Sequence, residues 1–273
     1  MSAPAATLTA STTANPGLSV EGLSVAYGGN VAVDKVDLDA PLGRITGLIG
    51  PNGAGKTTLF NAASGLLKPS QGEIALLGAR VTSLGPAARA RRGLGRTFQH
   101  IEVCKAMTVA ENVGLGAEAR AIAANPLRQL RLPSRVRRAI DLATDAALST
   151  CRIGDLAARQ VSTLSTGQRR LVELARVLAG GYSFLLLDEP SSGLDDDETS
   201  RFGEILRTVV GQEGFGILLV EHDMNLVLDV CDYIYVLDFG KLVFEGDPGA
   251  VRTSDIVRAA YLGDEWSDGT GHQ

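Results

Sequence analysis

The segment from Gly50 to Thr57 has residue types and a spacing that can hold a polyphosphate. It reads GPNGAGKT, a full match to the pattern GxxxxGK[ST]. Its glycines let the backbone turn tightly, so that several N–H groups point into one concavity at the positive end of a following helix. Lys56 is then expected to reach the terminal phosphates, and the Thr57 hydroxyl is a hard oxygen ligand suited to Mg²⁺. The residues expected to contact the nucleotide here are Gly50, Pro51, Asn52, Gly53, Ala54, Gly55, Lys56, Thr57 and Thr58.

Two acidic residues, Asp188 and Glu189, end the apolar run FLLLDE that begins at Phe184. A carboxylate at the C-terminal end of a strand faces the crevice where ligands bind in open α/β sheets. Asp188 is therefore a candidate ligand for Mg²⁺, directly or through water, and Glu189 is placed to orient an attacking water or to accept its proton. Two acids after a strand are more often a solvated turn, but the phosphate loop upstream favours the hydrolytic interpretation.

The elements that carry these residues predict an α/β fold with a mainly parallel sheet. ITGLI at 45–49 is expected to be a buried strand, and the segment 55–66 a helix after the phosphate loop. Further apolar strands are predicted from Phe184 and from Gly216, each followed by helix-compatible sequence. Near the end of the chain, YIYVLD and KLVFEG are predicted to pair across a turn at 239–240.

The two sides of this core have different patterns. LSVEGLSVAY and VAVDKVDLD, separated by Gly28 and Gly29, predict an antiparallel strand pair at the N-terminal side. The region 108–174 is helical in pattern and predicts an inserted helical subdomain of about 100–178. The ends are small, polar or acidic, so a disordered tail is expected at 1–17 and a flexible tail at 264–273.

Composition excludes several classes of protein. The net charge of −5 and the pI near 5.3 argue against wholesale electrostatic binding to nucleic acid or anionic lipid. The three cysteines have no CxxC spacing, which indicates neither a zinc site nor a disulfide framework and is typical of a reducing cytosol. The apolar runs are far shorter than the roughly 18 to 20 residues of a membrane helix.

The segment LSTGQ at 164–168 separates this chain from most other proteins that have a phosphate loop. It is similar to LSGGQ, the signature of the ATP-binding subunits of ABC transporters, and the chain resembles that family over about 18–263. Thr166 replaces the first glycine at the least constrained position, so Ser165, Gly167 and Gln168 are expected to keep the family roles. Ser165 is also a good N-cap for a helix whose free N–H groups can bind an anion.

The resemblance implies a P-loop ATPase core, the ligands ATP and Mg²⁺, and a dimer of two ATPase subunits, either identical or different. In this family two subunits pack head to tail, and each signature closes over the γ-phosphate that the partner's phosphate loop holds. Hydrolysis removes the group that both subunits share, so the dimer is expected to reopen afterwards.

Four further positions match the family residue by residue. Gln99 in GRTFQ resembles the glutamine that contacts Mg²⁺ or the water, and His222 in VEHDM resembles the histidine that contacts the γ-phosphate. Asp195 in SSGLD resembles an aspartate that couples the two sites, and Tyr27 in VAYGG resembles the aromatic residue that stacks on adenine. Without the family resemblance, a simpler interpretation is more common for each: a surface amide for Gln99 and a structural histidine for His222. For Asp195 it is a turn residue, and for Tyr27 a packed aromatic.

Several segments indicate which branch of the family the chain resembles. GRTFQ, MTVAEN, VEHDM and VRAAYLGDE resemble the ATPases of branched-chain amino acid importers. The resemblance implies a peripheral subunit on the cytoplasmic face of the membrane, with permease subunits and a separate solute-binding protein as partners. An ATPase of lipid or lipopolysaccharide export, an ABC ATPase acting on nucleic acid or ribosomes, and a P-loop kinase remain as alternatives.

Two basic stretches, 89–96 and 128–138, have several possible roles. Nucleic-acid binding, a solvated helical face, and contact with a membrane partner or anionic headgroups are all compatible with them. No nucleic-acid partner is expected, because the stretches lack the interleaved aromatic residues on which bases stack.

Overall fold

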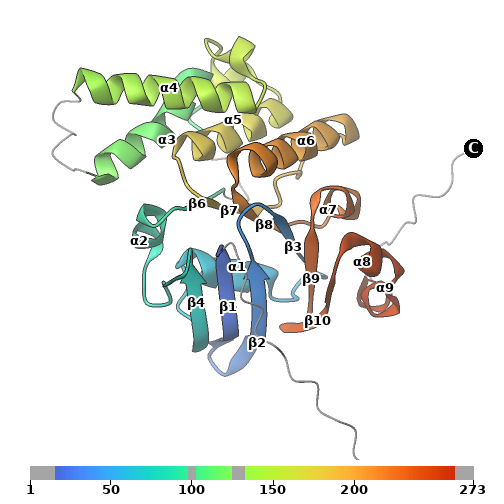
Figure 1. Ribbon diagram of the computed structural model, residues 1–273. Helices are drawn as coiled ribbons and strands as arrows, with labels where there is room; N and C mark the ends of the chain where they lie inside the picture. Colours follow the sequence, from blue (N-terminus) through green and yellow to red (C-terminus); the bar gives the residue numbers. More distant parts are fainter. Residues whose placement is uncertain (1–15, 98–102, 125–132, 262–273) are drawn as a thin grey trace, which may run out of the picture.

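The computed structural model describes residues 16–97, 103–124 and 133–261, and its strands form two sheets (Figure 1). One sheet is antiparallel, with the strand order β2-β1-β4-β5. The other has the order β10-β9-β3-β8-β7-β6 and is parallel except for β10 at its edge. The strands are β1 (Leu18–Tyr27), β2 (Asn30–Ala40), β3 (Ile45–Ile49), β4 (Gln71–Leu76), β5 (Ala79–Arg80), β6 (Leu94–Arg96), β7 (Phe184–Asp188), β8 (Gly216–Val220), β9 (Tyr233–Asp238) and β10 (Lys241–Gly246).

The mainly parallel sheet and the antiparallel strand pair predicted from the sequence are confirmed. The antiparallel sheet is larger than predicted, because β4 and β5 extend it beyond β1 and β2. The pattern analysis did not find β5 and β6, which have only 2 and 3 residues and are too short to show an alternation of apolar and polar side chains.

The parallel sheet is buried on both faces, which explains why its strands are continuous apolar runs. In β8, Ile217 and Leu219 belong to one hydrophobic cluster, whereas Leu218 and Val220 belong to the other. The first cluster includes residues of the helices α3 to α7. The second includes Leu59 of helix α1 and the inner face of the antiparallel sheet, so α1 is packed between the two sheets.

The helices α3, α4 and α5 pack against one another at the top of Figure 1 and form the helical subdomain. The chain from 108 to 174 is less regular than predicted, because two 3₁₀ turns, at 154–156 and 161–163, separate α4 from α5. Helix α1 is also shorter than the predicted 55–66, and left-handed glycines bound it at Gly55 (φ 101°) and Gly65 (φ 82°). The helices are α1 (Lys56–Ser64), α2 (Pro86–Arg91), α3 (Val109–Ala124), α4 (Ser134–Thr150), α5 (Thr166–Ala179), α6 (Asp196–Glu213), α7 (Met224–Val230), α8 (Pro248–Thr253) and α9 (Asp255–Tyr261).

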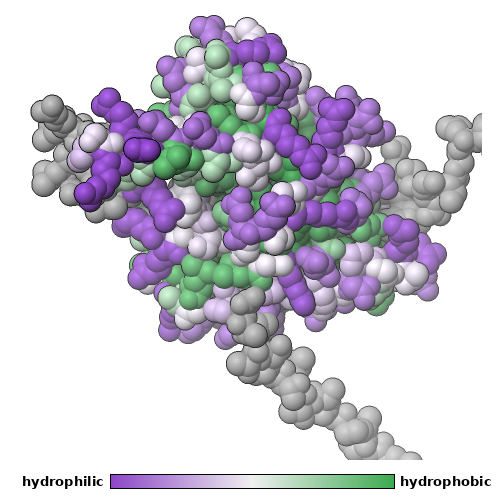
Figure 2. Space-filling model, turned by 45° about the horizontal axis from the view of Figure 1, so that its top comes forward, coloured by the Kyte–Doolittle hydropathy of each residue, from purple (hydrophilic) through white to green (hydrophobic). Residues whose placement is uncertain are grey.

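Polar side chains cover most of the face seen in Figure 2, and apolar residues reach the surface in small areas between them. Within the described ranges, none of the helices combines the length and the apolar character needed to cross a bilayer. The tails predicted at 1–17 and 264–273 lie outside the described residues except for Pro16 and Gly17, and Gln99 and Arg128 lie outside them as well. The domain limits of 18–263 stay a prediction.

The basic stretch 89–96 is not simply a solvated face. Arg91 and Arg92 are exposed, but Arg89 in α2 is 1% exposed. Its guanidinium donates hydrogen bonds to the carbonyls of Ala62 and Ala63 at the end of α1, both at 2.7 Å, and its Nε donates to Leu84 O at 2.9 Å. Burial lowers the pKa of Arg89 to about 10, so it stays charged at neutral pH. Arg89 therefore caps the negative end of the phosphate-loop helix.

Replacing Arg89 by Met is expected to lower the free energy of unfolding by about 3 kcal/mol, because several buried carbonyls would lose their donor at once. Urea denaturation measures the change. Arg91→Met in the same helix is the matched control and is expected to change stability by less than about 0.5 kcal/mol, since Arg91 is exposed. Equal losses in the two variants would contradict a capping role for Arg89.

Candidate functional site

The phosphate loop joins the end of β3 to the start of α1, as predicted. Two of its glycines have backbone conformations and surroundings that exclude a side chain. Gly50 has φ 151°, and a Cβ there would collide with the Leu237 carbonyl oxygen. At Gly55, φ is 101° and a Cβ would lie 2.6 Å from Ala32 O. The loop is thus pressed against β9 and β2 and can be built only with glycine at these points.

Lys56 lies over this loop. Its Nζ donates to Gly50 O at 2.5 Å and to Pro51 O at 3.0 Å, and the residue is 8% exposed. The next residue, Thr57, is exposed in the first turn of α1. An ammonium group, a hydroxyl and the N-terminal end of a helix are therefore gathered at one point, which favours an anion with an associated cation.

Asp188 and Glu189 stand at the C-terminal end of β7, the same edge of the parallel sheet as the phosphate loop. Asp188 is 5% exposed, and burial raises the pKa of its carboxyl, although the charges of Arg96 and Lys56 act in the opposite direction. Its Oδ2 accepts from Arg96 at 3.4 Å. Because a carboxylate has a second oxygen and further lone pairs, Asp188 together with the Thr57 hydroxyl fits the hard oxygen ligands that Mg²⁺ requires.

Glu189 has an unusual backbone conformation. Its φ is 45°, in the left-handed region that residues other than glycine rarely adopt, and its N–H donates to Val220 O at 2.8 Å. Conformations of this kind persist where the surrounding structure holds them, often at functional sites. Here the bond to the end of β8 holds Glu189 just beyond the strand, beside Asp188.

The signature residues form a second group, at the start of α5. Ser165 Oγ accepts from the Gln168 N–H at 3.2 Å, and the Gln168 side chain accepts from the Ser165 N–H at 3.1 Å, which completes a capping box. Ser165 is exposed, whereas Gly167 is buried. The Glu198 carboxyl lies so close to Gly167 that a Cβ there would collide with it.

Asp195 belongs to the same group, because the start of α6 lies beside the start of α5. Asp195 caps α6 by accepting from the Glu198 N–H at 2.8 Å, and Ser165 Oγ is 3.3 Å from Glu198 Oε1. The sequence predicted Ser165 and Asp195 separately. The structure brings them together through Glu198, which the sequence analysis missed.

His222 and Tyr27 both expose their side chains. The His222 side chain is 63% exposed and follows β8, and Tyr27 at the end of β1 is 52% exposed. Neither side chain is packed in the core, so both are accessible to a ligand.

A buried carboxylate next to His222 was not predicted. Glu221 is fully buried, and burial raises the pKa of its carboxyl. It accepts from the N–H of Ser191 at 2.8 Å and from that of His222 at 3.1 Å. The rule that singled out Asp188, an acid at the end of an apolar strand, would also have found Glu221 at the end of GILLV.

The comparison with protein families tests the resemblance stated from the motifs. The family described as ABC transporter matches residues 33–192, a segment that contains the phosphate loop, the signature and both acids of β7. The chain belongs to the ABC transporter family. It is accordingly an ATPase with the ABC cassette fold, and the resemblance stated from its motifs is confirmed.

Relatives of known role match this cassette over nearly all their length. LivG of Escherichia coli K12, named a high-affinity branched-chain amino acid transport ATP-binding protein, is 40% identical over 91% of this chain and 98% of its own length. BraF of Pseudomonas aeruginosa, with the same description, is 36% identical at the same coverage. LptB of Haemophilus influenzae, a lipopolysaccharide export ATP-binding protein, is 34% identical at the same coverage.

Solved structures of ABC cassettes agree with this fold. The ADP conformation of MJ1267, an ATP-binding cassette of an ABC transporter, superposes with a TM-score of 0.78 at 28% identity, covering 90% of this chain and 98% of MJ1267. CbiO1 of Clostridium perfringens superposes with a TM-score of 0.77 at 30% identity, covering 91% and 95%. The ABC cassette therefore accounts for both sheets and the helical subdomain.

Proposed function

We propose that this ABC ATPase powers an importer for branched-chain or other hydrophobic amino acids. The similarity to LivG and BraF over nearly the full length carries the proposal, and the segments GRTFQ, MTVAEN and VEHDM support it. The 34% identity to LptB makes lipid or lipopolysaccharide export the alternative.

Co-purification from membranes tests the proposal. Permease subunits together with uptake of labelled leucine that depends on this chain would support it. Dependence of lipid export on the chain would favour the alternative, and recovery with ribosomes or DNA would defeat both.

In the proposed reaction the phosphate loop holds ATP, while Thr57, Asp188 and Gln99 hold Mg²⁺. The cation would offset the charge of the phosphate oxygens. Glu189 orients the attacking water and accepts its proton, and His222 contacts the γ-phosphate. Tyr27 stacks on the adenine ring, and its exposed side chain supports that role.

Replacing Lys56 by Ala is expected to weaken ATP binding by about 10- to 100-fold, because a charge-assisted bond to phosphate is worth about 1.5–3 kcal/mol. A fluorescence titration with a nucleotide analogue measures the affinity. Lys68→Ala, an exposed lysine shortly after α1, is the control and is expected to bind as the unmodified protein does. An unchanged affinity in Lys56→Ala would remove Lys56 from the site.

The proposed active assembly is a dimer in which the start of α5 in one copy closes over the phosphate loop of the other. Ser165 and Asp195 are exposed at the adjoining starts of α5 and α6, so they are accessible to a second copy. The cap on α5 leaves N–H groups of its first turn directed at that surface, where a γ-phosphate would meet them.

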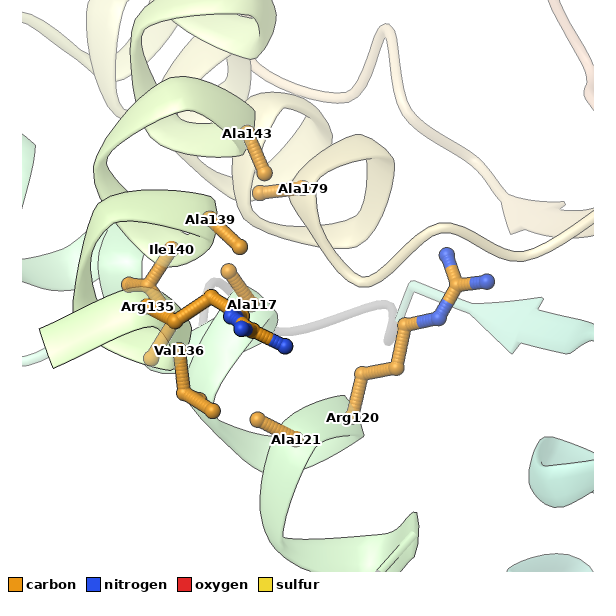
Figure 3. Close-up of a pocket in the computed structure, with 9 residues that line it drawn as sticks. All are labelled: Ala117, Arg120, Ala121, Arg135, Val136, Ala139, Ile140, Ala143 and Ala179. Atoms are coloured by element: carbon orange, nitrogen blue, oxygen red, sulfur yellow. The ribbon is translucent and has the colours of Figure 1, made fainter. Parts of the chain in front are cut away.

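The helical subdomain is the proposed contact with the permease. A pocket of about 430 Å³ lies between α3, α4 and α5 (Figure 3). Methyl groups of Ala117, Ala139, Ala143 and Ala179 line it, and Arg135 reaches toward it from α4. A small apolar segment of a membrane partner fits such a lining. We propose that the chain sits peripherally at the cytoplasmic face through this contact, and that a separate solute-binding protein selects the cargo.

A further inference from the structure

We propose that Arg96 is a positioning residue that clamps Asp188 to the phosphate-loop helix and so fixes the distance between the two protein groups offered to Mg²⁺. The inference rests on the proposed function, because it assigns Thr57 and Asp188 to the same cation. The sequence does not predict this role, because Arg96 stands there only as a member of the basic stretch 89–96 and of the segment GRTFQ.

The guanidinium of Arg96 makes contacts in two directions. On one side, Nη2 donates to Asp188 Oδ2 at 3.4 Å. On the other, Nη1 donates to Asn61 Oδ1 at 2.9 Å and to Ser64 Oγ at 2.7 Å, both in α1. The guanidinium carbon also lies 4.7 Å from the centre of the Phe60 ring, within the range of a cation–π contact. One side chain therefore joins β7 to the phosphate-loop helix.

The clamp is largely buried. The side chains of Arg96 and Asp188 are 13% and 6% exposed, so solvent screens their interaction weakly. Thr97, the residue after β6, adds a second restraint. Its N–H donates to Leu186 O at 3.0 Å, and its Oγ1 accepts from the Asp188 N–H at 3.4 Å. The end of β6 thus holds Asp188 through both its side chain and its backbone.

The two proposed ligands sit on separate elements, so their spacing depends on how these elements are joined. Thr57 is in the first turn of α1, and Asn61 lies one turn further along the same face. By holding Asn61 and Asp188 at once, Arg96 sets the position of the end of β7 relative to the turn that carries Thr57. Magnesium demands near-ideal octahedral geometry, so it is sensitive to such spacing.

An arginine is required for this arrangement. Its planar fork presents several donors at fixed angles, whereas a lysine offers one flexible ammonium group that cannot reproduce the bonds to α1 and to Asp188 together. If the ion pair of Arg96 with Asp188 were purely structural, its loss would lower the stability of the fold. The contribution of Mg²⁺ to nucleotide binding would then stay unchanged.

The test measures ADP affinity by calorimetry, with excess Mg²⁺ and with EDTA, in the full chain. The ratio of the two affinities reports the contribution of the cation without any turnover. In Arg96→Met we expect this ratio to fall about tenfold, as is typical when an outer-shell partner of a metal ligand is removed. The affinity in EDTA is expected to change less than about threefold, and Arg96→Lys is expected to recover little of the ratio.

The matched control is Arg152→Met, because the ion pair of Arg152 with Glu204 at 2.9 Å is about 60% exposed on both sides. It is expected to keep the ratio of the unmodified protein. An unchanged or higher ratio in Arg96→Met, or full recovery in Arg96→Lys, would overturn the clamp.

Asp188→Asn separates failure of this inference from failure of the proposed site. If Asp188→Asn keeps the full ratio, the proposed Mg²⁺ ligand is wrong and the clamp is wrong with it. If Asp188→Asn loses the ratio and Arg96→Met keeps it, only the clamp is wrong.

Should Arg96→Met not fold, the double variant Asn61→Ala, Ser64→Ala keeps the charge of Arg96 and removes its hydrogen-bond acceptors on α1. We expect that variant to lower the ratio by less than Arg96→Met does, and an unchanged ratio would again refute the clamp.

Discussion

Glu189→Gln is expected to bind ATP with nearly unchanged affinity while hydrolysing it about 10²- to 10⁴-fold more slowly. Glutamine keeps the size of the side chain and the backbone bond from residue 189 to Val220 O at 2.8 Å, but its amide cannot accept a proton from water. Because ATP then persists, the variant is expected to accumulate as an ATP-bound dimer. Phosphate release measures turnover, and size-exclusion chromatography with and without ATP measures the dimer.

The control for this variant is Glu213→Gln, at the exposed end of α6, where the side chain accepts a hydrogen bond from Thr150 Oγ1 at 3.1 Å. It is expected to hydrolyse ATP at the normal rate. Hydrolysis by Glu189→Gln at the rate of Glu213→Gln would show that another group orients the water. Slow hydrolysis without a stable dimer would instead argue against the shared nucleotide.

Ser165→Arg is expected to abolish the ATP-dependent dimer while changing nucleotide binding to the monomer less than about threefold. The long cationic side chain would fill the exposed surface at the start of α5, where the phosphate of the partner's nucleotide is proposed to lie. Loss of the N-cap costs only about 1 kcal/mol of stability, so the fold is expected to survive. Analytical ultracentrifugation in the Glu189→Gln background gives the fraction of dimer.

Two further variants isolate the steric effect in this experiment. Ser165→Ala removes the cap without adding bulk, and it is expected to weaken the dimer without eliminating it. Ser134→Arg makes the same substitution at an exposed serine at the start of α4 and is expected to dimerise normally. Normal dimer formation by Ser165→Arg would defeat the model in which two copies share each nucleotide.

Short stretches of the sequence determined the phosphate loop, the strands of the parallel sheet and a helix cap. The phosphate loop is a contiguous pattern whose glycines and lysine act over a few residues, so its place between a strand and a helix could be predicted. The strands of the parallel sheet are buried on both faces, and they therefore appear as unbroken apolar runs. The N-cap Ser165 acts on an N–H group three residues ahead, so its role could be predicted from local sequence. Asp195 makes the same kind of contact at the start of α6, but the sequence pointed to it only through the family resemblance.

The tertiary structure alone decided which charged residues lie inside and what they hold. Arg89 and Arg96 look like their exposed neighbours in the sequence, yet one caps α1 and the other reaches Asp188, 92 positions away. Glu221 is likewise buried against Ser191, 30 positions away. A charged side chain can be buried only where distant segments supply its hydrogen-bonding partners, and those partners meet only when the chain has folded.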